Sequence, residues 1–397
     1  MRSSSLIFIA GLIFIILTDT ILWYQLRKYL NKKWQISLYI LHSLFFVFSL
    51  VAFQFTVTRL KGPGAYFWLE KMIGILFLFY TPKVIFILLN GLGRIFRRIW
   101  PVFSKVMGIL ASFLSLSLFL LLLYSITWGR YQYKIETVQV PIKNLPSGLE
   151  NFKIVQLSDL HLGSYGENYP GITRLVNEVN SLHPDLIVFT GDMVNNFAAE
   201  TLPWIKTFQQ LNAPYGKFAI TGNHDYGDYT RWPDQESKKE NLRNFYRNME
   251  EMGFRMLNNT HVPIISGGDT LWLAGVENWG NPPFPRYGNL RQALDTLQEG
   301  QCIILLSHDP SHWRAEVLQY PVALTLSGHT HAMQLGFHIG KYKWSPSQYI
   351  YPEYDGLYRQ GWQYLYVSRG QGYLGFPGRI GLRPIITELI LTADTQQ

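Results

Sequence analysis

Polar side chains that can bind a metal ion recur in this sequence, each time directly after a short apolar run. The stretch Thr221-Gly222-Asn223-His224-Asp225 follows the apolar run Phe218–Ile220 and holds an amide, an imidazole and a carboxylate in consecutive positions. Gly222 allows a turn in which the backbone passes close to a ligand. An ordinary polar turn could have the same composition, so this stretch alone does not decide between the two interpretations.

The residues that recur in this arrangement combine carboxylate or amide oxygens with imidazoles. They are Asp159, His161, Asp192, Asn223, His224, His308, His329 and His331. Such a set suits borderline divalent ions such as Mn, Fe(II), Zn or Co. In Asp-x-His and His-x-His, alternate side chains of an extended segment face one side, so both can reach one centre. The set exceeds what one ion needs, which predicts two ions bridged by a carboxylate that Asp192 could supply. His308 or His329 alone would more often be a structural histidine.

The segments before these residues have the pattern of buried strands, and in the first half they alternate with helical segments. The expected strands are 138–141 at an edge, 153–159, 185–190, 217–221, 270–276, 302–307, 322–326, 364–367 and 385–391, and the expected helices are 169–182 and 202–211. Alternation of this kind predicts an α/β core, in which ligands bind at the carboxyl ends of the strands. The stretch 334–363, rich in Tyr, Trp, Gly and Pro, is expected to be a long ordered loop.

The first third of the chain has the composition of a membrane region. Four stretches are long and apolar enough to span a bilayer, at about Leu6–Tyr24, Ile36–Val57, Phe67–Leu89 and Val106–Trp128. Pro82 and Lys83 interrupt the third stretch, and Asp19 in the first is expected to make an interfacial or interhelical hydrogen bond. The expected domains are therefore a membrane domain over 1–130, a connector with a first edge strand over 131–152, and a catalytic domain over 153–397.

Charge is divided unequally between these regions. Residues 1–134 carry a net charge of +13 and residues 135–397 carry −5, within a total of +8. The basic balance therefore belongs to the membrane region and does not indicate nucleic-acid binding. The loops after the first and third spans hold more Lys and Arg than the loop after the second, which places those two loops in the cytoplasm and the C-terminal domain outside the cytoplasmic membrane. The single cysteine, Cys302, lies in an apolar run, which excludes disulfides and cysteine–metal sites.

The ordered motifs of the chain resemble those of the calcineurin-like metallophosphoesterase superfamily. The motifs are Asp159-x-His161, Gly191-Asp192, Gly222-Asn223-His224-Asp225, His308 and Gly328-His329-x-His331. The form of the last motif, with Ser368-Arg369-Gly370 and Arg379-x-Gly381 downstream, is similar to the membrane-attached bacterial branch. That branch often has Gly-Gly-Gln where this chain has Ala332-Met333-Gln334, a difference that touches no ligand.

The resemblance implies a fold and a set of residue roles. The fold would be a two-sheet β-sandwich flanked by helices. Asp159, His161 and His331 would hold one divalent ion and Asn223, His308 and His329 the other, with Asp192 as the bridge. His224 would bind the phosphoryl oxygen and protonate the leaving group, and Asp225 would orient His224. The arginines Arg369, Arg379 and Arg383 could bind an anionic substrate, although structural roles are commoner for such residues.

These observations predict a membrane-anchored dinuclear-metal phosphoesterase that hydrolyses a phosphomonoester or phosphodiester by attack of a metal-bound hydroxide. An alternative is a lipid phosphate or pyrophosphate hydrolase that works at the membrane surface, with membrane lipids as partners. A non-catalytic sensor is a third alternative, which the intact ligand set and His224 disfavour. The sequence does not name the substrate, the metal or the oligomeric state.

Overall fold

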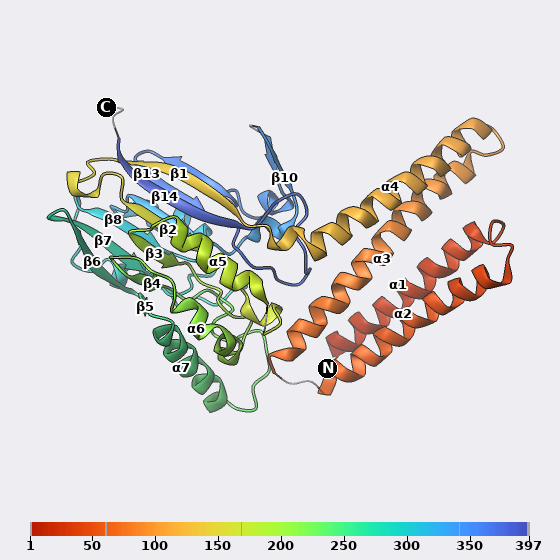
Figure 1. Cartoon of the computed structure of the whole chain (residues 1–397), viewed down its shortest axis with the longest axis horizontal. Coiled ribbons are helices and arrows are strands. Elements are labelled where there is room, and N and C mark those ends of the chain that lie inside the picture. Colours follow the sequence, from red (N-terminus) through yellow and green to blue (C-terminus); the bar gives the residue numbers. More distant parts are fainter. Residues whose placement is uncertain (1, 60–61, 168, 341, 395–397) are drawn as a thin grey trace. The chain divides into compact units, whose positions relative to one another are not determined.

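The computed structural model describes residues 2–59, 62–167, 169–340 and 342–394, and the chain divides into two compact units. Unit 1 contains the chain up to Thr127 together with the short segment Gly375–Gly378. Unit 2 contains the remaining described residues. Figure 1 shows long helices in unit 1, and sheets and shorter helices in unit 2.

Long apolar helices make up unit 1. They are α1 (Arg2–Leu26), α2 (Lys33–Arg59), α3 (Gly64–Ile95) and α4 (Pro101–Thr127). Each of the helices α1 to α4 contains a segment that is long and apolar enough to cross a membrane, which confirms the four predicted spans. Helix α3 continues through Pro82 without a break.

A buried polar cluster joins α1 to α3 and explains the charged residues within these apolar helices. Nζ of Lys83 lies 2.6 Å from Oδ1 of Asp19, and the hydroxyl of Tyr80 donates to Oδ2 of Asp19 at 2.9 Å. Ionisable groups inside a membrane segment are costly unless they pair within the helix bundle. Asp19 therefore makes the interhelical contact that its position predicted.

Unit 2 is built on two mixed sheets. In order across the first sheet, the strands are β1 (Lys134–Ile142), β14 (Ile385–Ala393), β2 (Lys153–Leu157), β3 (Leu186–Phe189), β4 (Lys217–Ala219) and β5 (Phe254–Met256). Across the second sheet they are β12 (Gly356–Gln360), β13 (Gln363–Val367), β9 (Leu324–Ser327), β8 (Cys302–Leu306), β7 (Asp269–Gly275) and β6 (Thr260–Ser266). Strands β2, β3, β4 and β5 pair with one another in parallel, as do β7, β8, β9 and β13. Antiparallel pairing joins β14 to β2, β6 to β7 and β12 to β13.

Alternate residues of each central strand enter different apolar cores. In β3, Leu186 and Val188 pack into a core shared with strands of the second sheet, while Ile187 and Phe189 pack into another core with helix residues. The same alternation in β8 sends Ile304 to the shared core, because successive side chains of a strand point to opposite faces. The sheets therefore face each other across one apolar layer, as expected for the predicted two-sheet architecture.

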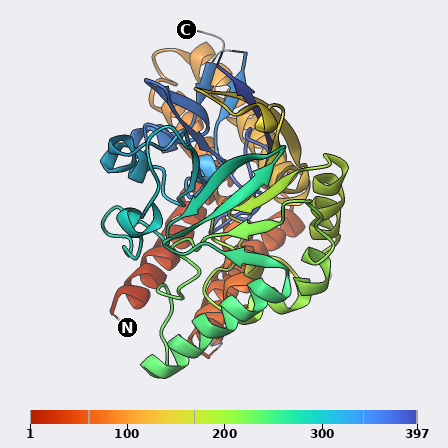
Figure 2. The same ribbon diagram turned by 90° about the vertical axis from the view of Figure 1, so that its left-hand side faces the viewer.

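Helices cover the outer faces of the sheets (Figures 1 and 2). They are α5 (Pro170–Ser181), α6 (Ile205–Phe208) and α7 (Gln235–Glu251) beside the first sheet, and α8 (Leu290–Ala293) and α9 (Ser311–Ala315) beside the second. Helix α5 confirms the predicted helix 169–182. The predicted helix 202–211 is wrong in part, because a 3₁₀ helix occupies Ala198–Trp204 and only α6 is α-helical.

Two features of unit 2 differ from the sequence interpretation. Helix α7 was not predicted, although Asp234 caps it by accepting a hydrogen bond from the Ser237 N–H. The stretch 334–363 is not only a loop, since it contains β12 and a separate two-stranded hairpin of β10 (Phe337–Ile339) and β11 (Tyr342–Trp344). This hairpin is not part of either sheet.

Candidate metal centre

The sequence-predicted ligands lie at the carboxyl ends of central strands from both sheets. Asp159 and His161 follow β2, and Asp192 follows β3. Asn223 and His224 follow β4, His308 follows β8, and His329 and His331 follow β9. Since the two sheets face each other, these strand ends bring side chains that are up to 172 residues apart in the sequence into one buried cluster.

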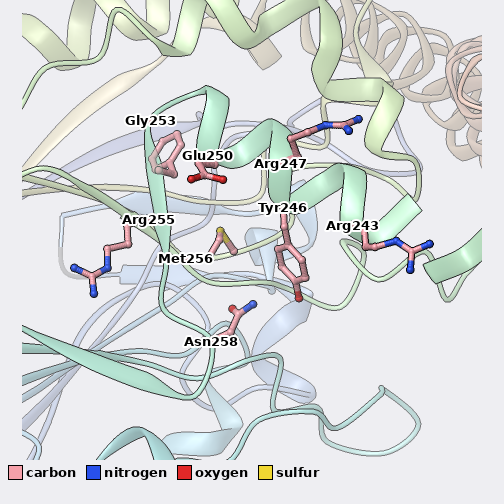
Figure 3. A pocket seen from close by; sticks show the side chains of 9 residues that line it. Arg243, Tyr246, Arg247, Glu250, Gly253, Arg255, Met256 and Asn258 are labelled. Atoms are coloured by element: carbon pink, nitrogen blue, oxygen red, sulfur yellow. The ribbon is translucent and has the colours of Figure 1, made fainter. Parts of the chain in front are cut away.

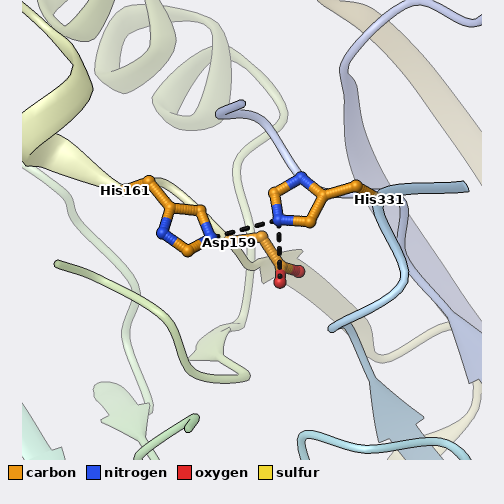
Figure 4. A group of neighbouring side chains, drawn as sticks. All are labelled: Asp159, His161 and His331. Carbon is orange, nitrogen blue, oxygen red and sulfur yellow. Dashed lines mark hydrogen bonds and ion pairs between the residues drawn. The ribbon is translucent and has the colours of Figure 1, made fainter. Parts of the chain in front are cut away.

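The first group of donor atoms comes from Asp159, His161 and His331. Their ligand atoms all lie within 4.8 Å of one another. Nε2 of His161 is 3.1 Å from Nε2 of His331, which is itself 3.5 Å from Oδ1 of Asp159. Figure 4 shows the two rings and the carboxylate directed toward a common point.

The second group comes from Asp192, His308 and His329, whose ligand atoms also lie within 4.8 Å of one another. Nε2 of His308 is 3.3 Å from Nδ1 of His329. Oδ1 of Asn223 lies 2.9 Å from the same Nδ1, which adds the predicted amide oxygen to this group.

Asp192 connects the two groups. Its Oδ2 lies 3.6 Å from Nε2 of His161 in the first group and 3.2 Å from Nε2 of His308 in the second. Its Oδ1 accepts a hydrogen bond from the backbone N–H of His224 at 2.9 Å, which fixes the carboxylate. The carboxylate is therefore placed where a bridging ligand would have to be.

Hydrogen bonds outside the cluster define which ring nitrogens face inward with a lone pair. Nδ1 of His161 faces Oδ1 of Asn195 at 3.1 Å, and Nδ1 of His308 faces the carbonyl oxygen of Thr190 at 2.7 Å. Because both partners are acceptors, each Nδ1 carries the proton and each Nε2 is left as a donor to a cation. Lone pairs and carboxylates that face one another repel unless a positive charge lies between them, so the donor set fits divalent ions.

Electrostatics within the cluster support this conclusion. Burial alone would lower the pKa of His308, but neighbouring Asp192 raises that pKa to about 10. Burial would raise the pKa of Asp192, yet His308 and His224 hold it well below its usual range. Burial lowers the pKa of His161 to about 3, so this ring stays neutral and able to bind a metal. The raised pKa of His308 thus shows that the cluster stabilises positive charge at this position.

The backbone of the cluster is strained. Positive φ angles occur at Asp159 (53°), His161 (49°), Asp192 (61°), His329 (72°) and His331 (48°). Residues other than glycine rarely adopt this backbone conformation. Where the surrounding structure imposes it, the conformation costs about 1–3 kcal/mol per residue. Strain of this kind concentrates at functional sites, where it directs side chains toward a ligand.

Two glycines permit the close approach of these loops. A Cβ on Gly222 would lie 2.3 Å from Oδ1 of Asp192, and one on Gly328 would lie 2.3 Å from Oδ2 of Asp159. Both distances are too short for a side chain, so any other residue would displace a carboxylate. The backbone at Gly222 therefore passes close to Asp192, one of the predicted metal ligands.

His224 lies beside the donor groups but belongs to neither of them. Its ring is 4.9 Å from the His161 ring and 4.5 Å from the Tyr229 ring, between centroids. Nδ1 of His224 is 2.9 Å from the backbone oxygen of Asn195, which leaves Nε2 for a substrate. Asn195 thus contacts both His161 and His224, a role that sequence reasoning missed.

The expected orienting role of Asp225 is wrong. Its carboxylate accepts hydrogen bonds from the backbone N–H groups of Asp192, Met193, Val194 and Gly222. With both oxygens directed at the backbone, Asp225 joins the loops after β3 and β4 instead of orienting the His224 ring. Asp225 is therefore a positioning residue for Asp192.

The three downstream arginines are held by other protein groups. Arg369 makes a bidentate ion pair with Asp355, with Nη1 2.8 and 2.7 Å from the two oxygens. Nη2 of Arg379 donates to the carbonyl oxygens of residues 369, 370 and 372, and Nε of Arg383 donates to the carbonyl oxygen of Gln132. All three arginines therefore have the structural role that was the alternative to substrate binding.

Aromatic side chains line one edge of the centre. The hydroxyl of Tyr351 lies 2.9 Å from Nε2 of His329, and the Phe284 ring contacts the His329 ring edge-on with centroids 4.9 Å apart. Phe284 and Tyr351 also line a cavity of about 160 Å³. A larger hollow, between α7 and β5, is lined by described residues that include none of the predicted ligands (Figure 3).

Comparison with known proteins agrees with this geometry. The family described as "Calcineurin-like phosphoesterase" matches residues 152–333, and "Probable Calcineurin-like phosphoesterase, transmembrane domain" matches residues 1–130. The "Uncharacterized metallophosphoesterase YkuE" of Bacillus subtilis (strain 168) is 35% identical over 276 residues, which cover 66% of this chain and 88% of that protein. The chain belongs to the calcineurin-like metallophosphoesterases.

Other relatives of this metallophosphoesterase match either part of the chain or nearly all of it. The "Transmembrane protein with metallophosphoesterase domain" of Danio rerio is 32% identical, and the match covers 65% of this chain and 57% of that longer protein. An "Uncharacterized metallophosphoesterase" of Helicobacter pylori (strain ATCC 700392 / 26695) is 27% identical over 390 residues, covering 94% of this chain and 95% of that protein. The second match extends over the membrane helices as well as unit 2.

Asn195 offers a test of how the ring of His161 is held. Asn195→Ala removes the acceptor for Nδ1–H of His161 while the backbone carbonyl that faces His224 remains, so we expect metal affinity to fall about 10–100-fold. Asn195→Asp keeps an acceptor oxygen and should retain most of the affinity. Titration of the metal-free protein with Mn²⁺ or Zn²⁺ measures both variants. Equal affinity losses in the two variants would show that Asn195 acts only through packing.

Proposed function

We propose that this metallophosphoesterase is a membrane-anchored hydrolase of a phosphomonoester or phosphodiester that uses two divalent ions. The observation that supports this function most directly is the position of Asp192, whose carboxylate is shared by two groups of inward-facing donors. Mn, Fe, Zn and Co all suit these donors. When bound, such ions supply an activated water and offset negative charge on the phosphoryl oxygens.

The side chains of the chain divide the remaining work. Asp159, His161 and His331 would hold one ion, Asn223, His308 and His329 the other, and Asp192 would bind both. His224, which is partly exposed beside the first group, would direct Nε2 at the substrate because Nδ1 is held by the Asn195 carbonyl. A protonated Nε2 can donate to a phosphoryl oxygen and then transfer its proton to the oxygen of the leaving group.

The expected result for His224→Ala separates metal binding from proton transfer. Since His224 is not in either donor group, the variant should keep near-full metal content and lose about 10²–10⁴-fold in kcat. The loss should shrink for nitrophenyl phosphate, whose leaving group departs without protonation. Kinetics with alkyl and nitrophenyl phosphates, together with elemental analysis, test this. A uniform loss for both leaving groups would contradict the acid role, and loss of metal would make His224 a ligand.

We also propose that the protein lies in the cytoplasmic membrane with unit 2 on the extracytoplasmic side. The support is the distribution of basic residues: the loops between α1 and α2 and between α3 and α4 carry more Lys and Arg than the loop between α2 and α3. An alkaline phosphatase fused after Gln397 should be active, because this reporter folds only outside the cytoplasm. Activity only of a cytoplasmic reporter at the same position would reverse this orientation.

A further inference from the structure

The β10–β11 hairpin has one apolar face and one polar face. Cross-strand neighbours share a face, so the pairs Phe337↔Trp344 and Ile339↔Tyr342 form one side of the hairpin. The exposed fractions of Phe337, Ile339 and Tyr342 are 43%, 69% and 66%. The pair His338↔Lys343 lies on the opposite side, where Nζ of Lys343 donates to the backbone oxygen of Asp355 at 2.6 Å.

Exposed apolar side chains continue beyond the strands of the hairpin. Leu335, two residues before β10, is 37% exposed, and Tyr349 and Ile350 after β11 are 76% and 62% exposed. Between residues 136 and 332 of the described chain, exposed large apolar residues are spaced far apart in the sequence, such as Leu202 and Ile265. A concentration of exposed aromatic and aliphatic side chains marks a surface that contacts protein or membrane.

Both ends of the hairpin lead directly to the metal centre. His331 of the first donor group precedes β10 by six residues, and Tyr351, whose hydroxyl contacts His329, follows β11 by seven residues. Oγ of Ser345 donates to the backbone oxygen of Ala332 at 2.6 Å and closes the base of this segment. Ile350 and Tyr351 also line the cavity beside His329. An apolar surface therefore continues to the site at which the reaction is proposed.

Hydrogen bonds join the base of the hairpin to residues on either side of the segment Gly375–Gly378, which groups with the membrane helices. Gly336 N–H donates to Ile380 at 3.0 Å, and Gln334 Oε1 accepts from the Leu374 N–H at 2.7 Å. Between Leu374 and Arg379 the chain belongs to unit 1, where the Gly375 N–H donates to Glu70 at 2.9 Å. Since the chain between Leu374 and Arg379 belongs to a unit whose helices are long and apolar enough to cross a membrane, a lipid bilayer is the partner that we consider for the exposed apolar face.

We propose that the apolar face of the hairpin, formed by Phe337, Ile339, Tyr342 and Trp344, lies in the interfacial region of the bilayer, and that the substrate is a phosphate ester or diphosphate carried by a membrane lipid. Aromatic side chains favour this region because their rings are amphipathic. The inference about the substrate rests on the proposed hydrolase function. The oxygen of a water adds to phosphorus and gives up a proton to solvent, while the bond to the leaving oxygen breaks. That oxygen takes a proton from Nε2 of His224, and His224 regains a proton from solvent.

Fluorescence quenching tests the membrane contact without any activity. The full chain carrying Ile339→Cys is labelled with nitrobenzoxadiazole and placed in phosphatidylcholine vesicles that contain brominated lipid; Cys302 is buried and does not compete for the label. Ile265→Cys on β6 is the matched control, because Ile265 is 63% exposed on unit 2. We expect strong quenching at position 339 and little at position 265. Equal quenching at both positions, or none at position 339, would overturn the bilayer contact.

Kinetics of Ile339→Asp test the substrate class. In vesicles that contain phosphatidic acid or an isoprenyl diphosphate, we expect kcat/KM to fall about tenfold or more, because a charge replaces an apolar side chain at the face that would enter the bilayer. Hydrolysis of soluble nitrophenyl phosphate should not change, and Ile265→Asp should affect neither reaction. Wild-type activity on nitrophenyl phosphate without activity on either lipid would overturn the lipid substrate. Failure of the wild type on every ester would reject the hydrolase function, while the quenching result would still decide the membrane contact.

Discussion

The main constraint on the structure is that metal-binding donor atoms, which repel one another, are held close together at the ends of the central strands. Carboxylates of Asp159 and Asp192 and the lone pairs of four imidazoles converge within a buried space. Protein groups fix these atoms from outside, as the Thr190 carbonyl fixes His308. Positive charge at the centre would offset this repulsion, and the raised pKa of His308 beside Asp192 has the same electrostatic cause.

The two sheets act together to form this cluster. The first sheet contributes the Asp-x-His and Asp192 loops and the second contributes the histidine loops, so neither sheet alone holds a complete donor group. Asp225 reinforces the first sheet by binding four backbone N–H groups across adjacent loops. Packing of the apolar layer between the sheets thus sets the distances on which the proposed chemistry depends.

Residues whose geometry is local were predictable from the sequence, while those that depend on tertiary contacts were not. The motif Gly328-His329-x-His331 places its donors within a few residues, and short apolar runs located the strands before it. The group that orients His224 was not predictable, because the carboxylate next to it in the sequence, Asp225, binds backbone N–H groups. The backbone carbonyl that does contact the His224 ring comes from another loop, at Asn195. Helix α7 was missed because its polar sequence hides a narrow apolar stripe around Phe245 and Met249.

Metal content in variants of the two carboxylates tests the central claim most directly. If Asp192 serves both ions, purified wild-type protein should hold about two equivalents of divalent metal, and Asp192→Asn should lose most of both. Asp159→Asn, which alters only the first donor group, should lose about one equivalent. Elemental analysis of the three proteins under the same conditions provides the measurement. Two full equivalents in Asp192→Asn, or the same loss in both variants, would contradict a shared carboxylate.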